Sequence, residues 1–317
     1  MEHYDLLIIG SGPAGLTAGI YGARSGLKTA VAAGMQRGGQ LTITPHVENF
    51  PGFPEKVNGA ELMELMEKQA ANMGAKIISD TITKVDFKVR PFKLLGDDGA
   101  EYTATTVVIA TGAKPRWLGL ESEQKFMGTG VSACATCDGF FFKNKRVCVV
   151  GGGSAAVEEA LYLAGLASHV TLIHRRDALR AEKVLQERLK SNEKISVEWD
   201  SQVVEILGTD TPRKVTGVQL KNTKTGAGKI LPLDGVFVAI GHQPNSQVFK
   251  GAVDMDDEGY IITAADSTKT NIEGVFAAGD VQDRVFRQAV TSAGTGCKAA
   301  IEAQAMFDKC FQSKDAC

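Results

Sequence analysis

Tyr4-Asp-Leu-Leu-Ile-Ile-Gly10-Ser-Gly12-Pro-Ala-Gly15 is the stretch on which the fold of this chain depends. Its first half is short and apolar and stops at a glycine, which is typical of a buried parallel strand. The glycines recur as Gly-x-Gly-x-x-Gly and lead into a helical pattern from Leu16 to Ser25. In this strand–loop–helix setting, glycines allow a tight turn and let the backbone approach a pyrophosphate. We therefore predict a dinucleotide-binding unit here.

The same strand–loop–helix pattern occurs a second time. Arg146-Val-Cys-Val-Val-Gly151-Gly-Gly153-Ser-Ala-Ala156 repeats it, and alanine is tolerated at the third glycine position. Ser154 is the predicted N-cap of the helix that follows. From the first glycine to the end of the second predicted strand, the stretches Gly10–Ala33 and Gly151–His174 are equally long. One such motif is a weak signal, whereas two in matching register strongly indicate two nucleotide-binding units.

The two units differ at the end of their second strand. In the first unit the predicted strand Lys28–Ala33 ends in Ala33-Gly34, where an Asp or Glu would usually hold the ribose. We expect backbone groups of the glycine-rich loop Gly34–Gln40 to replace that acid. In the second unit, His174-Arg175-Arg176 and then Arg180 form a basic cluster. Arginine grips phosphate with two parallel hydrogen bonds, so the cluster fits the 2′-phosphate of NADP.

The alternative for this cluster is a solvated basic face of the next predicted helix, Ala181–Lys190. This alternative applies to Arg180 more than to Arg175 and Arg176.

The remaining elements complete an α/β pattern. A helix is predicted over Glu61–Asn72, a hairpin turn at Asp97-Asp98-Gly99, and short strands and turns over Ser196–Lys221. Apolar strands end at Gly112 and Gly241, followed by Lys114-Pro115 and by a predicted turn at His242-Gln-Pro244. We expect the chain to cross between domains at these two places.

The last part of the chain returns to the first nucleotide. Gly274-Val-Phe-Ala-Ala-Gly279-Asp280 is a predicted strand ending in a carboxylate, and a helix is predicted over Ser292–Phe307. Asp280 can accept hydrogen bonds from a ribityl or ribose chain. The start of the helix can stabilise negative charge, as on a flavin ring.

Cys134-Ala-Thr-Cys137-Asp138 lies between the two glycine-rich loops. Two cysteines at this spacing can form a readily exchanged disulfide, and Asp138 could carry a proton to or from a thiolate. Half of a zinc site, or two packed thiols in a turn, would have the same spacing. No second Cys-x-x-Cys exists, which argues against zinc, and we expect no metal. Cys148 and Cys297 are predicted to be packing residues, and Cys310 and Cys317 fall in the tail.

Bulk properties exclude several classes of protein. At 317 residues the chain can form two domains, and a net charge of −2 gives no reason to expect nucleic acid or a membrane as partner. The start of the chain shows no secretory signal and no apolar run is long enough to span a bilayer. Six cysteines with one close pair are not a secreted disulfide framework, so we expect a cytoplasmic protein.

The combination of both glycine-rich loops, the Cys134–Cys137 pair, the 174–180 basic cluster and Gly279–Ala289 resembles the bacterial-type, low-molecular-weight thioredoxin reductases over essentially the whole chain. The resemblance implies two Rossmann-like, three-layer ββα domains. An NADPH-binding domain, 116–242, would be inserted into a discontinuous FAD-binding domain, 1–115 and 243–317. It also implies a homodimer.

The resemblance further implies FAD on the first unit and NADPH on the second. The FAD site would comprise Gly10, Ser11, Gly12, Pro13, Ala14, Gly15, Ala33, Gly34, Gly38, Gly39, Gln40, Asn49, Ala110, Thr111, Gly112, Gly279, Asp280, Arg287, Gln288 and Ala289. The NADPH site would comprise Gly151, Gly153, Ser154, His174, Arg175, Arg176 and Arg180. Ser154 stands where Asn or Asp is commoner, and Ala33 where an acid is frequent.

The activity that the resemblance implies is NADPH-dependent reduction of the thioredoxin disulfide through FAD and Cys134–Cys137. Cys137 would face the flavin, Cys134 would attack the substrate, and Asp138 would manage the proton. Rotation of the NADPH-binding domain would exchange the two half-reactions. Three alternatives remain open: an enzyme of this build with another donor such as ferredoxin or NADH, a flavoprotein redox sensor or carrier, and a ferredoxin–NADP reductase of related fold.

Overall fold

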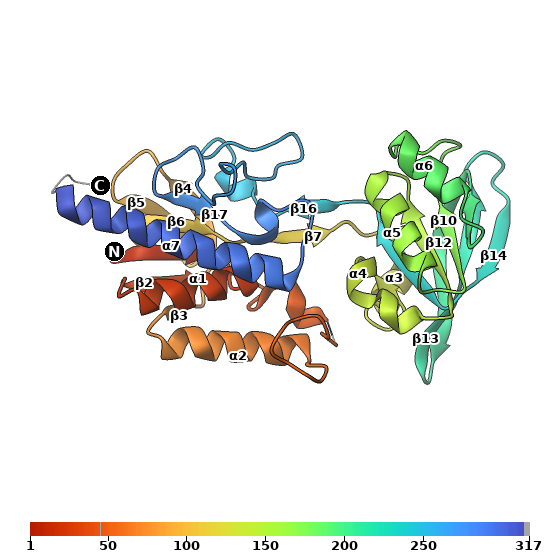
Figure 1. Cartoon of the computed structure of the whole chain (residues 1–317), viewed down its shortest axis with the longest axis horizontal. Coiled ribbons are helices and arrows are strands. Elements are labelled where there is room, and N and C mark those ends of the chain that lie inside the picture. The colour runs from red at the N-terminus through yellow and green to blue at the C-terminus, as the bar shows by residue number, and fades with distance from the viewer. Residues whose placement is uncertain (45, 314–317) are drawn as a thin grey trace. The chain divides into compact units, whose positions relative to one another are not determined.

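The computed structural model describes residues 1–44 and 46–313, and the chain forms two compact units. Unit 1 consists of Met1–Lys114 with Gln243–Cys317, and unit 2 of Pro115–His242 (Figure 1). Where the chain passes from one unit to the other, β7 (Ala113–Pro115) and β16 (His242–Pro244) pair as a two-stranded sheet. The predicted turn at His242–Pro244 is therefore wrong: backbone pairing makes this segment a strand.

Unit 1 is built around a mostly parallel sheet in the order β3-β2-β1-β6-β5-β4, with β17 also paired to β6. The pairs β4–β5 and β5–β6 are antiparallel, and the other strand pairs of this sheet are parallel. The strands are β1 (Glu2–Ile9), β2 (Thr29–Ala32), β3 (Lys76–Ile78), β4 (Ile82–Asp86), β5 (Phe92–Gly96), β6 (Glu101–Ile109) and β17 (Val275–Ala277). The long β6 pairs with β5 through its first half and with β17 through its second.

Helices cover one face of this sheet. They are α1 (Pro13–Arg24), α2 (Gly59–Asn72) and α7 (Ala289–Ser313), which lie next to one another in Figure 1. Their apolar side chains share one core cluster with β1 and β2. A second cluster fills the other face, where Phe249, Val253 and Ile261 pack on the sheet. The single-turn helices of this unit are η1 (Gly39–Ile43), η3 (Gln247–Phe249) and η4 (Gly279–Val281).

Unit 2 has three layers. Its central sheet is parallel in the order β11-β10-β9-β15-β8, from strands β8 (Val131–Ser132), β9 (Arg146–Gly151), β10 (His169–Ile173), β11 (Ile195–Glu198) and β15 (Gly235–Ala239). Helices α5 (Ser154–Ala164) and α6 (Lys183–Lys190) cover one face. An antiparallel sheet covers the other, formed by β12 (Ser201–Asp210), β13 (Arg213–Asn222) and β14 (Gly228–Pro232). Short helices α3 (Glu121–Phe126), α4 (Ala135–Asp138) and η2 (Gly139–Phe142) precede β9.

The predicted fold class is confirmed, with three local corrections. Helix α7 begins at Ala289 rather than near Ser292, and β12 and β13 form a long hairpin instead of short strands. The predicted N-cap is also wrong, because α5 is capped by Gly153 and Ser154 is its first helical residue.

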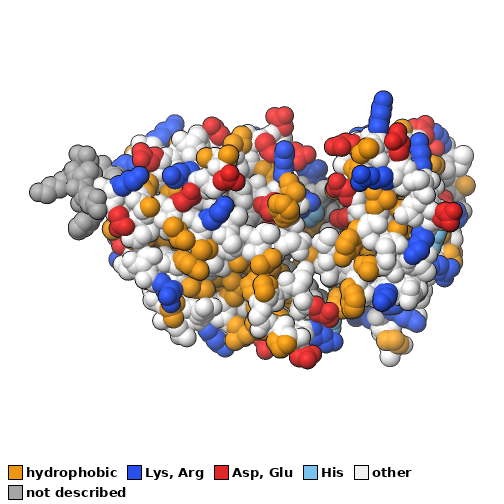
Figure 2. Space-filling view, in the orientation of Figure 1, with side chains coloured by type: hydrophobic (Ala, Val, Ile, Leu, Met, Phe, Trp, Pro, Cys, Tyr) orange, Lys and Arg blue, Asp and Glu red, His pale blue; other side chains and the backbone are white. Residues whose placement is uncertain are grey.

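The surface carries charges of both signs, interspersed over the face in Figure 2, in keeping with the small net charge. Among the described residues, no helix has the length and apolar character needed to cross a membrane.

Candidate active site

Cys134 and Cys137 are joined by a disulfide, with an S–S distance of 2.09 Å. Cys134 is the N-cap of the short helix α4, and its Sγ accepts a hydrogen bond from the Cys137 amide at 3.2 Å. The turn brings the two Cα atoms to 5.3 Å, within the usual range for a disulfide. After reduction, the same amide would stabilise negative charge on the Cys134 sulfur. The pair is thus placed for reversible thiol–disulfide chemistry.

Asp138 lies directly after the pair and is half-buried. Burial raises the pKa of its carboxyl group, opposed by a hydrogen bond with Ser132. The Ser132 hydroxyl also accepts from the Cys134 amide at 3.0 Å. A carboxyl group that keeps its proton above the usual range suits proton transfer to a thiolate. Ser132 was missed by sequence reasoning, because it precedes the cysteine motif and no pattern marks it.

The first glycine-rich loop joins β1 to α1. Gly10 has φ +110°, and a Cβ there would collide with the Ala110 carbonyl. A Cβ on Gly15 would collide with the Gly10 carbonyl, so strand and helix pack at glycine distance. Gly12, the N-cap of α1, has no side-chain cap, and a Cβ there would meet nothing. Pro13 occupies the first helical turn, where its missing N–H costs nothing.

Hydrogen bonds of Ser11 connect the 33–40 loop of unit 1 to the first glycine-rich loop. The Ser11 hydroxyl donates to the Ala33 carbonyl at 2.8 Å and accepts from the Gly38 amide at 2.9 Å. A Cβ on Gly39 would lie 3.3 Å from the Gly12 backbone. The loop bearing Gly34, Gly38, Gly39 and Gln40 therefore lies against the first glycine-rich loop. No acid stands at Ala33, so a ribose bound here would have to be held by groups other than a carboxylate at this position.

Asp280 is brought to the same end of unit 1 by η4. Its carboxylate accepts a hydrogen bond from Ser292 of α7 at 2.9 Å. Burial raises the pKa of Asp280 to about 6, which the Ser292 bond partly opposes. The helix packs tightly on α1, since a Cβ on Gly296 would collide with the Ala14 backbone. Gly279 donates its amide to Thr295 of α7 at 2.9 Å.

The other predicted residues of unit 1 lie around these loops. Ala110 continues β6 and donates its amide to Ile9. Thr111 donates its hydroxyl to the Asn245 carbonyl at 2.7 Å, and Gly112 has φ +68°. Asn49 donates to Gln288 at 3.4 Å. Just before α7, Arg287 has φ +46°, a conformation that strains a residue with a side chain, and Ala289 begins the helix.

The second glycine-rich loop repeats the geometry of the first in unit 2. A Cβ on Gly151 would collide with the Ala239 carbonyl. Gly153 has no side-chain cap at the start of α5, and a Cβ there would meet nothing, as at Gly12. Ser154 accepts a hydrogen bond from the Glu182 amide at 3.3 Å.

The basic cluster of unit 2 divides into exposed and buried members. Arg175, Arg176 and Arg180 are exposed, and none has an ion pair within the described part of the chain. His174 is only 6% exposed, and both of its ring nitrogens lie at 3.0 Å from backbone carbonyls. The guanidinium groups are therefore available to an anion, whereas the imidazole is already occupied.

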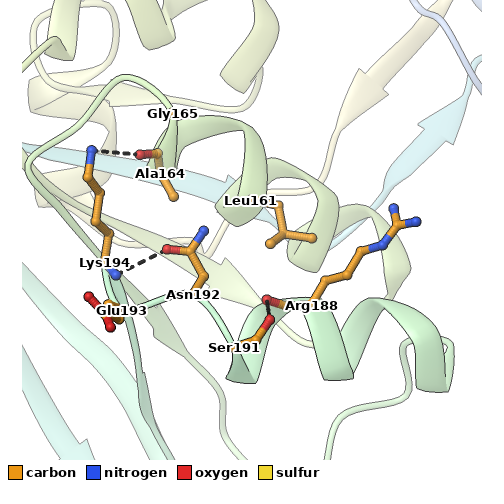
Figure 3. A pocket seen from close by; sticks show the side chains of 8 residues that line it. All are labelled: Leu161, Ala164, Gly165, Arg188, Ser191, Asn192, Glu193 and Lys194. Carbon is orange, nitrogen blue, oxygen red and sulfur yellow. Dashed lines mark hydrogen bonds between the residues drawn. The ribbon is translucent and has the colours of Figure 1, made fainter.

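A pocket of about 660 Å³ lies elsewhere in unit 2, between the C-terminal ends of α5 and α6 (Figure 3). Lys194 reaches across it to the Ala164 carbonyl at 3.2 Å. None of the predicted site residues lines this pocket. Within the described residues, no three His, Cys, Asp or Glu side chains are grouped to hold a metal ion.

Comparisons with known proteins agree with this arrangement. Residues 4–296 match the family model of the pyridine nucleotide-disulphide oxidoreductases. The chain is 60% identical over 304 residues to thioredoxin reductase of Rickettsia bellii, covering 96% of this chain and 98% of the relative. Thioredoxin reductase structures from Giardia duodenalis (39% identity, TM-score 0.93, 97% and 100% coverage) and Streptococcus pyogenes (42%, 0.91, 97% and 99%) are similar.

The chain therefore belongs to the pyridine nucleotide-disulphide oxidoreductases. Within that class it is a member of the thioredoxin reductase family, whose enzymes use FAD and NADPH. The residues present fit these two cofactors. Both α1 and α5 have a glycine N-cap that faces open space and has no side-chain hydrogen bond, which suits a pyrophosphate, and Asp280 is a half-buried acceptor near the first.

Proposed function

We propose that this chain passes electrons from NADPH, bound by unit 2, through FAD, bound by unit 1, to Cys134–Cys137 and then to thioredoxin. The observation that carries this proposal is the disulfide itself, which lies in the same compact unit as the second glycine-rich loop. When bound, FAD supplies the exchange between hydride transfer and disulfide reduction. Residues 1–115 and 243–317, which differ from unit 1 only by Pro115, then form the FAD-binding domain, and 116–242 the NADPH-binding domain.

Two loops and one carboxyl group hold FAD in this proposal. The backbone amides of Ser11, Gly12 and Ala14 would face the pyrophosphate, Pro13 having no N–H, and the 33–40 loop would contact the adenosine end. Asp280 accepts hydrogen bonds from the ribityl chain, and the 287–289 segment at the start of α7 contacts the ring. Asn49 and Thr111 complete the site.

Unit 2 holds NADPH through the start of α5 and the exposed arginines. The amides that follow Gly153 face the pyrophosphate, while Arg175, Arg176 and Arg180 grip the 2′-phosphate. Their exposure and lack of ion pairs within the described residues favour an anionic ligand over a solvated helix face. This also favours NADPH over NADH or ferredoxin as donor.

The protein residues perform the thiol chemistry. The Cys134 thiolate attacks one sulfur of the substrate disulfide, and the other sulfur leaves with a proton managed by Asp138. Cys137, the sulfur that faces the flavin, then attacks Cys134, which releases the second substrate thiol and restores the Cys134–Cys137 disulfide. Phe140 and Phe141, 61% and 36% exposed, lie three and four residues after Cys137 and favour a protein as substrate over a small disulfide.

The disulfide and the nicotinamide site lie in one unit but must reach the flavin in turn. We therefore infer that unit 2 rotates about the crossings at 114–116 and 242–245 between half-reactions. A homodimer in the cytoplasm is the assembly and location that accord with the family.

The decisive experiment is a visible spectrum of the purified protein with an NADPH titration. We expect a yellow protein that NADPH bleaches and that reduces thioredoxin only when both cysteines are present. A colourless protein that retains no flavin would refute the proposal. In a variant with the two units cross-linked, one half-reaction should proceed and the other should fail, and normal turnover would refute the rotation.

A further inference from the structure

His174 is the one member of the basic cluster that does not face solvent. Its ring, at the end of β10, lies between two backbone carbonyls: Nδ1 is 3.0 Å from the Gly151 oxygen and Nε2 is 3.0 Å from the Ala178 oxygen. Carbonyl oxygens only accept, so each contact needs an N–H from the ring. A neutral ring supplies one of these hydrogen bonds, and a ring with hydrogens on both nitrogens supplies both. Neither nitrogen is left for a ligand.

The ring also fills the space beside the second glycine-rich loop. A Cβ on Gly152 would collide with three of the ring atoms of His174. On another side the ring meets the edge of Trp199, with centroids 6.3 Å apart. The imidazole is therefore held by packing as well as by hydrogen bonds, and its position is coupled to that of the loop.

Two further hydrogen bonds join the same pair of segments. The Arg180 amide donates to the Gly152 carbonyl at 2.8 Å, and the Glu182 amide donates to Ser154 at 3.3 Å. From outside, Thr223 donates to the Arg175 carbonyl at 3.2 Å. The backbone of segment 175–180 is thus held by hydrogen bonds on both sides, while the guanidinium groups of its three arginines remain exposed.

We propose that His174 is a positioning residue that sets the spacing between the pyrophosphate-binding loop and the 2′-phosphate-binding arginines. The two segments it joins would contact two phosphates of one nucleotide. His174 then gives the chain its preference for NADPH over NADH without touching either. This inference rests on the proposed function, since it requires the nucleotide to bind in unit 2.

The test is His174→Ala in the FAD-containing enzyme, with adenosine 2′,5′-bisphosphate as the probe and adenosine 5′-monophosphate as its counterpart lacking the 2′-phosphate. Calorimetry should give an affinity for the bisphosphate lowered by about ten- to a hundredfold, as expected when a charge-assisted hydrogen bond to the 2′-phosphate is lost. Affinity for the monophosphate should change much less. In turnover, KM for NADPH should rise while KM for NADH and kcat change little.

His169→Ala is the matched control. His169 begins the same strand, β10, and bonds Ser196 at 2.8 Å instead of the nucleotide loop. It should leave both affinities unchanged. If the alanine variant at 174 fails to fold, His174→Gln keeps a donor nitrogen at one of the two contacts and should show an intermediate loss of preference.

Gly152→Ala provides an independent test through a double-mutant cycle. Alone, it should displace the ring and mimic His174→Ala. Combined with His174→Ala, it should add no further loss, because the collision partner is gone. Fully additive effects would overturn the coupling.

Replacing Arg175 and Arg176 together by alanine separates the two proposals. If that variant keeps its preference for the bisphosphate, nucleotide binding in unit 2 is wrong. If it loses the preference and His174→Ala keeps it, only the positioning role is wrong.

Discussion

The two strand–loop–helix segments have the same backbone construction but differ in the side chains that lie next to them. In unit 1, Gly10–Gly15 is joined by the loop at 33–40, whose one charged side chain, Arg37, is paired with Glu67, and by the half-buried Asp280. In unit 2, Gly151–Ala156 is joined by exposed arginines. In the proposed function, both loops would bind a pyrophosphate at a helix start, because their glycines let the backbone approach it closely. The segments that follow determine which dinucleotide each unit prefers.

Within the described residues, a disulfide is found in unit 2 alone, and removing it should produce the largest effect. Cys134→Ser or Cys137→Ser should lower thioredoxin reduction by at least about 10³-fold, because a single sulfur can neither resolve a mixed disulfide nor form the Cys134–Cys137 disulfide. The NADPH-induced bleaching of the flavin should persist. Stopped-flow absorbance and a thioredoxin reduction assay measure the two effects. Cys297→Ser, on α7 of unit 1, is the control, and comparable losses there would contradict the assignment.

Asp138, the proposed proton donor, stands beside the cysteine pair and is therefore also part of unit 2. Asp138→Asn should slow thioredoxin reduction by about 10²-fold, the usual contribution of a positioned acid. Because burial raises the pKa of Asp138, the wild-type rate should fall as pH rises through a value above 3.8. That step should be absent from the pH profile of the asparagine variant. Asp210→Asn, at an exposed carboxylate paired with Lys125, should change neither rate nor profile.

The half-buried Asp280 of unit 1 predicts a pH-dependent stability. With its pKa raised from 3.8 to about 6, its stabilising contribution is complete below 3.8 and is lost as pH rises through 6. The free energy of unfolding of the apoprotein, relative to Asp280→Asn, should fall by about 3 kcal/mol between pH 3.5 and 8. Urea unfolding at several pH values measures this.

Glu302 of α7 is the control for Asp280, because its shift has the opposite sign. Burial favours a higher value, but hydrogen bonds from Ser267 and Thr268 outweigh it and the pKa of Glu302 is lowered. Wild type should therefore gain stability over Glu302→Gln as pH rises. If both variants changed with pH in the same direction, the inferred environments would be wrong.

Gly12 and Gly153 allow the two loops to be compared directly, with the smallest expected effects. Each faces open space, so alanine is accommodated by the protein but intrudes on a pyrophosphate. Gly12→Ala should weaken FAD binding and Gly153→Ala NADPH binding, each by about tenfold or ~1.4 kcal/mol. Titration of each cofactor measures this. Gly10→Ala, which collides with backbone, should instead destabilise unit 1 itself.

Local patterns predicted most of the elements correctly. Strands β1, β2, β9 and β10 and helices α1, α2 and α5 appear where apolar runs and glycines placed them. The sequence-based prediction failed where backbone contacts or helix-end geometry decide the local structure. His242–Pro244 became a strand by pairing with Ala113–Pro115, and Ser154 lost its capping role to Gly153. Cys310 lies within α7, whereas Cys317 is outside the described residues.

The sequence by itself determined the two glycine-rich loops and the redox pair, because each depends on residues a few positions apart and on backbone conformations or bonds that only glycine or cysteine provides. Tertiary structure alone decided how these parts are supported. Ser132 reaches Asp138, Ser11 joins Ala33 to Gly38, and His174 joins Gly151 to Ala178. Such contacts depend on how strands and loops fold back on one another, and ordinary serines and histidines give no sign of them in the sequence.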